Sequence, residues 1–208
     1  MQATKCFEED DASSRLEELQ LSLEDVLYAV GFGEAAANSC TKNDPVTLSG
    51  MLRWGRTLRG LRDRCGRNGW KLSRSGGLET IVSPCGKRAI AVTTGNANTG
   101  LGPAPKSKYP KGPTTESAVS SNEQLWLFPP ERPAKVDGQR QTWILLLSPG
   151  EEQVFCELSL PVSIGSDGRI DGWLERIILP PVDRDQLPDV VPKDSGPDID
   201  IPVVRKTS

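Results

Sequence analysis

The sequence predicts an α+β fold in which N-terminal helices precede a mostly antiparallel β-sheet. Two apolar stripes of helical period lie within 14–68, and β-rich runs separated by turn residues follow from residue 78 onward. Long Gly/Pro-rich loops separate these elements. We expect a flexible acidic N-terminus at 1–13, a single α+β domain at 14–179 and a Pro/Asp-rich extended tail at 180–208.

The first helical region starts from a capping signal. Ser14 and Glu17 have the spacing of a capping box, and apolar residues then recur with a period near 3.6 up to Val30. Ser22 can instead cap a second, shorter helix, so one helix or two both fit the pattern. Two glycines after Val30 are expected to end the helical pattern.

An arginine-rich amphipathic helix is predicted over 47–68. Its apolar stripe consists of Leu48, Met51, Leu52, Gly55, Leu58, Leu61 and Cys65. Arginines lie mainly on the opposite side, although Arg59 and Arg62 fall nearer the stripe. Glycines at 66 and 69 supply the C-terminal stop signal.

Charge is distributed unevenly along a chain whose net charge is only −3. Residues 1–50 carry ten acidic and three basic side chains, whereas 51–75 carry one acidic and eight basic ones. Guanidinium groups on one helix face can bind phosphates, so nucleic-acid or anion contact is one hypothesis for the helix. Its residues are Arg53, Arg56, Arg59, Arg64 and Arg67. The alternatives are a solvated face, internal pairing with the acidic N-terminal region, or docking to an acidic protein.

A β-hairpin is predicted next, with strands at 78–83 and 88–94 around a Pro-Cys-Gly-Lys turn. The order of elements over 14–94 resembles that of a winged-helix domain. That resemblance implies a nucleic-acid-binding function, in which the Arg-rich helix meets DNA and Lys87 and Arg88 form a wing. The lysines of the following loop, Lys106, Lys108 and Lys111, would assist.

A Gly- and Asn-rich turn follows the second hairpin strand, which is where a phosphate-binding turn would lie. The backbone of Gly95, Asn96, Asn98 and Gly100 could bind an anion, and an enzyme or binder acting on a phosphorylated ligand is therefore a third functional hypothesis. The turn lacks the Gly-Lys-Ser/Thr of a P-loop. The alternative is an irregular turn in which these residues tolerate positive φ.

The second half of the chain reads as a short helix and four strands in an antiparallel meander. The helix is predicted at 114–121, and the strands at 124–128, 142–147, 153–164 and 169–179. Pro161 indicates a bulge or an edge position, and Asp167-Gly168 a hairpin turn. Four aromatic residues in these strands are expected to pack in the core or at an interface: Trp126, Trp143, Phe155 and Trp173.

Composition lowers the expectation of catalysis. The chain has no histidine, which removes the usual general base and the commonest metal ligand. Its five cysteines are scattered and odd in number, which argues against a zinc ribbon and a disulfide framework. Carboxylates at Glu157, Asp167, Asp171 and Glu175 show no metal-binding pattern, and turn chemistry explains Asp167 and Asp171 better. We therefore expect no catalytic residue, no metal and no cofactor.

The leading functional hypothesis is a non-enzymatic binding or accessory subunit that docks on a larger protein assembly. Charge segregation, Pro-rich segments and the missing catalytic residues motivate it. A charged segment leading into an apolar run is not found at the N-terminus, and no stretch of about 18 apolar residues occurs. We expect a cytoplasmic protein with a protein partner, no membrane association, and nucleic acid as an alternative partner.

Overall fold

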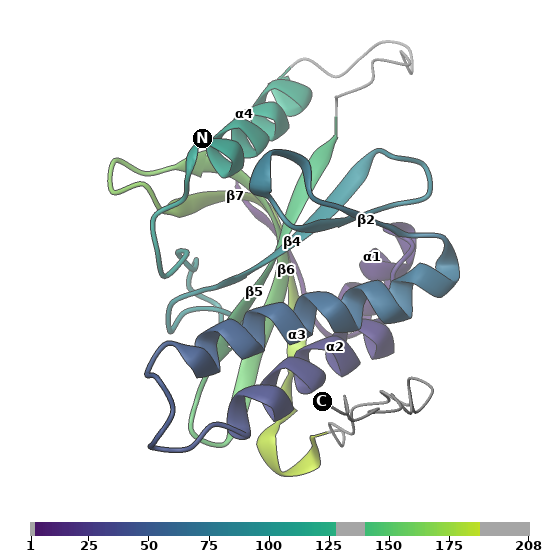
Figure 1. Ribbon diagram of the computed structural model, residues 1–208. Helices are drawn as coiled ribbons and strands as arrows, with labels where there is room; N and C mark the ends of the chain where they lie inside the picture. Colours follow the sequence, from purple (N-terminus) through teal and green to yellow (C-terminus); the bar gives the residue numbers. More distant parts are fainter. Residues whose placement is uncertain (1–2, 128–139, 188–208) are drawn as a thin grey trace, which may run out of the picture.

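The computed structural model describes residues 3–127 and 140–187. Within them the chain forms helices and strands in an α+β arrangement, which confirms the predicted class (Figure 1). The elements are β1 (Lys5–Phe7), α1 (Glu9–Glu18), α2 (Leu23–Asn38), α3 (Leu48–Cys65), η1 (Gly66–Asn68), β2 (Lys71–Ser73), η2 (Ser75–Gly77), β3 (Thr80–Val82), β4 (Arg88–Thr94), α4 (Pro113–Leu127), β5 (Gln141–Pro149), β6 (Gln153–Ile164), β7 (Ile170–Asp183) and η3 (Arg184–Gln186).

The described strands form one sheet in the order β1-β7-β6-β5-β4-β3-β2. This sheet is mixed, and the prediction of a mostly antiparallel sheet is corrected. β1 runs parallel to β7 and β4 parallel to β5, while the other neighbours are antiparallel. The parallel β4–β5 pairing requires a crossover, which the 95–111 loop and α4 supply. No local pattern in either strand specifies that partner.

The helices α1, α2 and α3 cover one face of the sheet (Figure 1). Strand alternation directs Trp143, Leu145 and Leu147 of β5 toward these helices, where they join a large core with Leu58 and Leu61 of α3. All five side chains are at most 2% exposed. The main hydrophobic stabilisation of the fold therefore lies between these helices and the sheet.

The opposite face is covered by α4 and by the 95–111 loop. Ile144 and Leu146 of β5 point to this side and form a smaller core with Val119 of α4, Ile170 and Trp173. The Trp173 ring nitrogen donates to the carbonyl of Pro105 at 2.9 Å, so the loop is held against the sheet. Packing on this face is shared between apolar contacts and polar ones.

Helix boundaries differ from prediction in the first forty residues. Two helices form and Ser22 occupies the N-cap position of α2, as the Ser22 alternative predicted, but α2 is the longer of the two and the Ser22 side chain makes no capping hydrogen bond. The capping-box prediction is wrong: α1 begins at Glu9, and the Ser14 hydroxyl lies inside it and donates to the Asp10 carbonyl. Ordered structure therefore begins before residue 14. Helix α2 also continues through both glycines to Asn38, so the predicted stop is wrong. Gly33 instead allows α3 to approach closely, since a Cβ there would lie 2.7 Å from the Arg53 carbonyl.

The predicted strand at 124–128 is wrong over the described residues, because α4 extends through Leu127. Trp126, expected in the core or at an interface, is 44% exposed, whereas Trp143 and Trp173 are buried in the core. The register shifts around Pro161, as the predicted bulge required.

Strand β7 continues past residue 180 to Asp183. Its prolines at 180 and 181 are tolerated because the three-residue β1 pairs only with 175–177 and leaves that part of β7 at an edge. The remaining tail, 188–208, lies outside the described residues.

The predicted hairpin is confirmed as β3 and β4, but it does not stand apart from the sheet. β2 pairs with β3, and β5 pairs with β4. The hairpin is thus an interior part of the seven-stranded sheet rather than a projecting wing. The likeness to a winged-helix domain is limited to the order of helix and hairpin.

Candidate functional site

Several arginines of α3 are paired within the chain. Arg53 forms an ion pair with Glu34, and Arg62 pairs with Glu79. Arg64 lies 3.6 Å from Asp25, with its guanidinium 3.9 Å from the centroid of the Tyr28 ring. Arg59 makes a more exposed contact of 3.4 Å with Asp63. Among the described residues only Arg56 and Arg67 of α3 and its η1 extension lack an ion pair, so these arginines do not form one free patch.

Glu34 is the centre of the most buried charge cluster on the helical face. Its carboxylate is 0% exposed and accepts hydrogen bonds from Arg53 and from Arg184 of η3. Burial by itself would raise the pKa of Glu34, but hydrogen bonds and charge from the two arginines hold that pKa below its usual value. Arg184 also donates to Asn38, so the cluster joins α2, α3 and the end of β7.

The predicted basic residues beyond α3 are dispersed. Lys106 lies 3.5 Å from Asp171, and the Lys111 ammonium donates to the Thr93 hydroxyl at 2.7 Å. Burial lowers the pKa of Lys111. Lys108 lies 5.7 Å from the centroid of the Tyr109 ring. Lys87 is exposed in the hairpin turn, and Arg88 opens β4.

The Gly95 to Gly102 turn uses its backbone donors internally. The N–H groups of Gly95 and Asn96 donate to the carbonyls of Leu147 and Lys106. The Asn96 side chain accepts from the N–H of Asn98 at 3.2 Å. At Gly100 the N–H donates to the Glu157 carboxylate at 2.8 Å. These donors, proposed from the sequence for a bound anion, thus already have partners.

A buried ion pair fixes this turn to the sheet. Glu157 of β6 and Arg176 of β7 are 0% and 2% exposed. The Arg176 guanidinium donates two hydrogen bonds to the Glu157 carboxylate, one to each oxygen. Arg176 also donates to the carbonyls of Leu101 and Gly102. Gly100 has φ +72°, and a Cβ there would lie 3.2 Å from the backbone of β6. The glycine is therefore explained by close approach and a positive φ rather than by a ligand.

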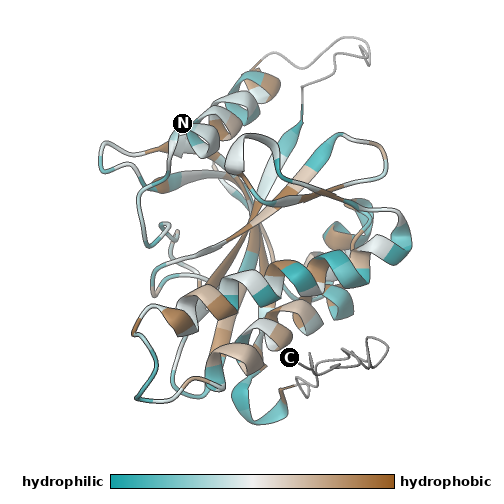
Figure 2. Cartoon of the chain, viewed as in Figure 1, coloured by the Kyte–Doolittle hydropathy of each residue, from teal (hydrophilic) through white to brown (hydrophobic). Residues whose placement is uncertain are grey.

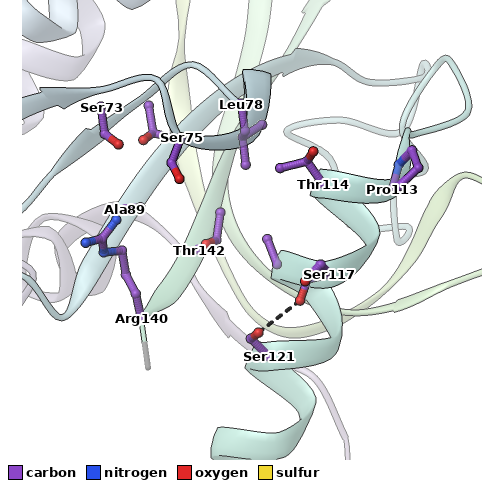
Figure 3. Close-up of a pocket in the computed structure, with 12 residues that line it drawn as sticks. Ser73, Ser75, Leu78, Ala89, Pro113, Thr114, Ser117, Ser121, Arg140 and Thr142 are labelled. Carbon is purple, nitrogen blue, oxygen red and sulfur yellow. Dashed lines mark hydrogen bonds between the residues drawn. The ribbon is translucent and has the colours of Figure 1, made fainter. Parts of the chain in front are cut away.

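A groove of about 690 Å³ lies where α4 leaves part of this face uncovered (Figure 3). Its floor comes from Thr80 of β3, Ala89 of β4 and Thr142 of β5, and α4 forms one wall. Seven lining side chains carry hydroxyl groups: Ser73, Ser75, Thr80, Thr114, Ser117, Ser121 and Thr142. Among the described residues that line the groove, Arg140 is the only charged one. We call this site the hydroxyl groove.

The N-terminal half of α3 exposes large apolar side chains. Met51 and Trp54 are 64% and 42% exposed, and Val46 in the preceding loop is 96% exposed. Figure 2 shows hydrophobic colouring at this end of the helix. Met51 was predicted to lie on the buried stripe, and that stripe is buried only from Leu58 onward. We call Val46, Met51 and Trp54 the α3 apolar face.

The five cysteines are free thiols that differ in burial. Burial raises the pKa of Cys65 and Cys156 to about 12, which keeps both thiols protonated. Cys85 is exposed in the hairpin turn, where a hydrogen bond with Ser83 lowers its pKa. In the described part of the chain, no group of three or more His, Cys, Asp or Glu side chains could hold a metal ion.

Within 3–127 and 140–187, no helix is both long and apolar enough to cross a membrane.

Comparisons with protein-family models, curated proteins and solved structures found no match.

Sequence reasoning missed both surfaces that the structure brings forward. The lining of the hydroxyl groove comes from β2, β3, β4, β5 and α4, so no short motif contains it. Its one local signal is the five serine and threonine residues within 114–121. In the sequence, the residues of the α3 apolar face look like core residues. An apolar stripe predicts an amphipathic helix, but it does not predict how much of that helix the sheet covers.

Proposed function

We propose that this chain is a non-enzymatic binding or accessory subunit that docks on a larger protein through the α3 apolar face. One observation carries the proposal: Met51 and Trp54 are 64% and 42% exposed on a helix whose later stripe residues, Leu58 and Leu61, are 2% and 0% exposed. The same helix thus contributes fully buried apolar residues to the core over its C-terminal half, while over its N-terminal half Leu48 and Leu52 are half-buried and Met51 and Trp54 are exposed.

The residue types favour a protein partner. Tryptophan and methionine are enriched at protein interfaces, and tryptophan is among the residues whose loss weakens binding most. An apolar helix face is also suited to docking in a hydrophobic groove, with anchors one helical turn apart. Met51 and Trp54 have that spacing. We therefore expect the partner to present an apolar groove.

The surrounding structure supports this use of α3. Arg53 lies between the two apolar anchors in sequence but points to the buried Glu34. Arg184 holds the same carboxylate, so the helix is fixed on its inner side. A preorganised helix loses little conformational entropy on binding, which favours affinity.

A photo-crosslinking amino acid at position 51 in the native host tests the proposal. We expect a covalent product with one larger protein, which mass spectrometry then identifies. The complex reconstituted from purified components should weaken at least about 30-fold in Trp54→Asp, because a buried carboxylate without a partner is costly at an apolar interface.

Leu72→Asp is the matched control, because Leu72 is 61% exposed on the edge strand β2 and is not part of the α3 apolar face. It should bind as the wild type does. Cross-links confined to the chain itself, or to a second copy, would contradict the proposal. Salt-dependent duplex DNA binding that is lost in Arg56→Glu with Arg67→Glu would favour the nucleic-acid alternative instead.

A further inference from the structure

The hydroxyl groove is a second surface, remote in composition from the α3 apolar face. We propose that it binds a small phosphate ester, with Arg140 as the partner of the phosphate and threonine hydroxyls as hydrogen-bond donors. This inference rests on the groove alone and does not depend on the docking function.

Arg140 supplies the charge that selects an anion. Its Nε donates to the Gly86 carbonyl at 3.0 Å, which orients the guanidinium. Neither terminal nitrogen has a hydrogen bond or an ion pair with a described residue. Because no carboxylate lines the groove in the described part of the chain, the two terminal nitrogens are available to bind a phosphate in a bidentate manner.

Two buried threonines present polar groups to the same space. Thr80 and Thr142 are 4% and 6% exposed and line the groove, and neither hydroxyl has a hydrogen-bond partner among the described residues. The two hydroxyl oxygens themselves are not buried, so they are open to the groove and can donate hydrogen bonds to ligand oxygens. Thr142 is also fixed in place, because Asn122 bonds its backbone N–H at 2.8 Å and its carbonyl at 2.9 Å.

Size and composition favour a small, polar ligand. A volume of about 690 Å³ lies within the usual range for small-molecule sites. Ala89 and Ala118 leave room, and the remaining lining is dominated by hydroxyl groups, which suit the hydroxyls of a phosphorylated polyol or sugar. The first turn of α4, at Pro113 and Thr114, also adjoins the groove and adds the positive end of a 15-residue helix.

Calorimetric titration of the whole chain tests the assignment. The probes are inorganic phosphate, glycerol 3-phosphate and glucose 6-phosphate, with glycerol and glucose as matched ligands without phosphate. We expect the esters to bind and their parent alcohols to remain silent. Arg140→Gln should weaken binding of the esters by about tenfold or more, because a charge-assisted bidentate contact is lost.

Ala118→Glu is a second variant, which adds a repelling carboxylate to the groove without removing any contact. It should weaken the esters to a similar extent while circular dichroism shows an unchanged fold. Arg67→Gln is the matched control, since Arg67 is exposed and has no ion pair among the described residues, and it should bind within about twofold of wild type. The assignment would be overturned if no ester binds, if Arg67→Gln loses as much affinity for the esters as Arg140→Gln, or if only a phosphoserine peptide binds.

Discussion

The two faces of the sheet are closed in different ways. On the face of α1, α2 and α3, periodic apolar side chains fill the interface, and the buried Glu34 sits with Arg53 and Arg184. On the face of α4, an irregular loop crosses the sheet and covers a buried ion pair between Glu157 and Arg176. One face is closed mainly by burial of apolar surface, and the other depends on specific polar contacts.

The difference follows from what each covering segment needs. The backbone N–H and C=O groups of a helix are hydrogen-bonded within the helix. It can therefore pack on the sheet through apolar side chains alone. The loop over 95–111 has no such internal ladder. Its backbone groups must find other partners, and Glu157 and Arg176 provide them for Gly100, Leu101 and Gly102. On this face the buried charges therefore satisfy the backbone of a covering segment that has no regular structure of its own.

The largest expected effect is on the loop-covered face. Arg176→Met leaves the Glu157 carboxylate buried without its charge partner, and should lower the free energy of unfolding by about 3–5 kcal/mol. Urea denaturation measures the change. Arg169→Met, at a half-exposed arginine, is the matched control and should change it by less than about 0.5 kcal/mol. Equal losses in the two variants would show that burial does not distinguish them.

A double variant distinguishes the cost of an unpaired buried charge from the loss of the hydrogen bonds that hold the 95–111 loop. Arg176→Met combined with Glu157→Leu leaves no buried charge, so it should be more stable than Arg176→Met alone. The Gly100 amide loses its acceptor in the double variant and should exchange with solvent faster than in the wild type. Hydrogen exchange followed by mass spectrometry detects that change, and unchanged protection of this loop would contradict the anchoring role.

Acid should weaken the helical face through Glu34. Burial alone raises the pKa of this carboxyl, but Arg53 and Arg184 bring it below its unfolded value of 4.5. The ionised carboxylate therefore contributes stability above about pH 4.5, and that contribution is lost as the pH falls through the folded-state pKa. Glu34→Gln should lower the free energy of unfolding by about 1.5–3 kcal/mol at pH 7. The difference in stability between this variant and the wild type should become smaller at low pH.

Thermal unfolding monitored across pH 3–7 measures this dependence. Glu123→Gln, at an exposed position later in α4, is the control and should show no comparable dependence on pH. A gap between Glu34→Gln and wild type that stays constant with pH would exclude the carboxylate charge as the cause.

Close packing of α2 and α3 should show an intermediate effect. A Cβ at Gly60 would lie 2.9 Å from Ala29 Cα, so Gly60→Ala must separate the two helices and should lose about 1–2 kcal/mol. Gly55→Ala in the same helix meets nothing within 4 Å and should gain about 0.5–1 kcal/mol from helix propensity. Chemical denaturation of both variants checks the opposite signs, and a shared sign would contradict the packing interpretation.

The smallest effect is expected at an exposed pair of the helical face. Arg59 and Asp63 are 55% and 61% exposed and lie 3.4 Å apart. Arg59→Ala should change the free energy of unfolding by no more than about 0.5 kcal/mol, since solvent and salt screen the contact. A loss above 1 kcal/mol by urea denaturation would show that exposure alone does not set the value of a charge pair here.

Local patterns predicted several elements well. The Arg-rich helix, the β3–β4 hairpin and the bulge at Pro161 follow from periodicity, turn residues and the missing proline N–H. The candidate sites were less predictable. The predicted arginines share a helix, but Arg53 and Arg64 pair with carboxylates of α2, which are 19 and 39 positions away in sequence. The turn at Gly95 to Gly102 has the composition of an anion site, yet Glu157 from a distant strand binds its Gly100 N–H.

The sequence by itself determined which segments have helical or strand periodicity, where the chain turns, and that positive charge gathers in one helix. Only the tertiary structure decided the parallel pairings of β1 and β4, the partner of each arginine, and the exposure of Met51 and Trp54. The physical reason is range: propensity and periodicity act between neighbours in sequence, whereas pairing and burial depend on which distant segments meet.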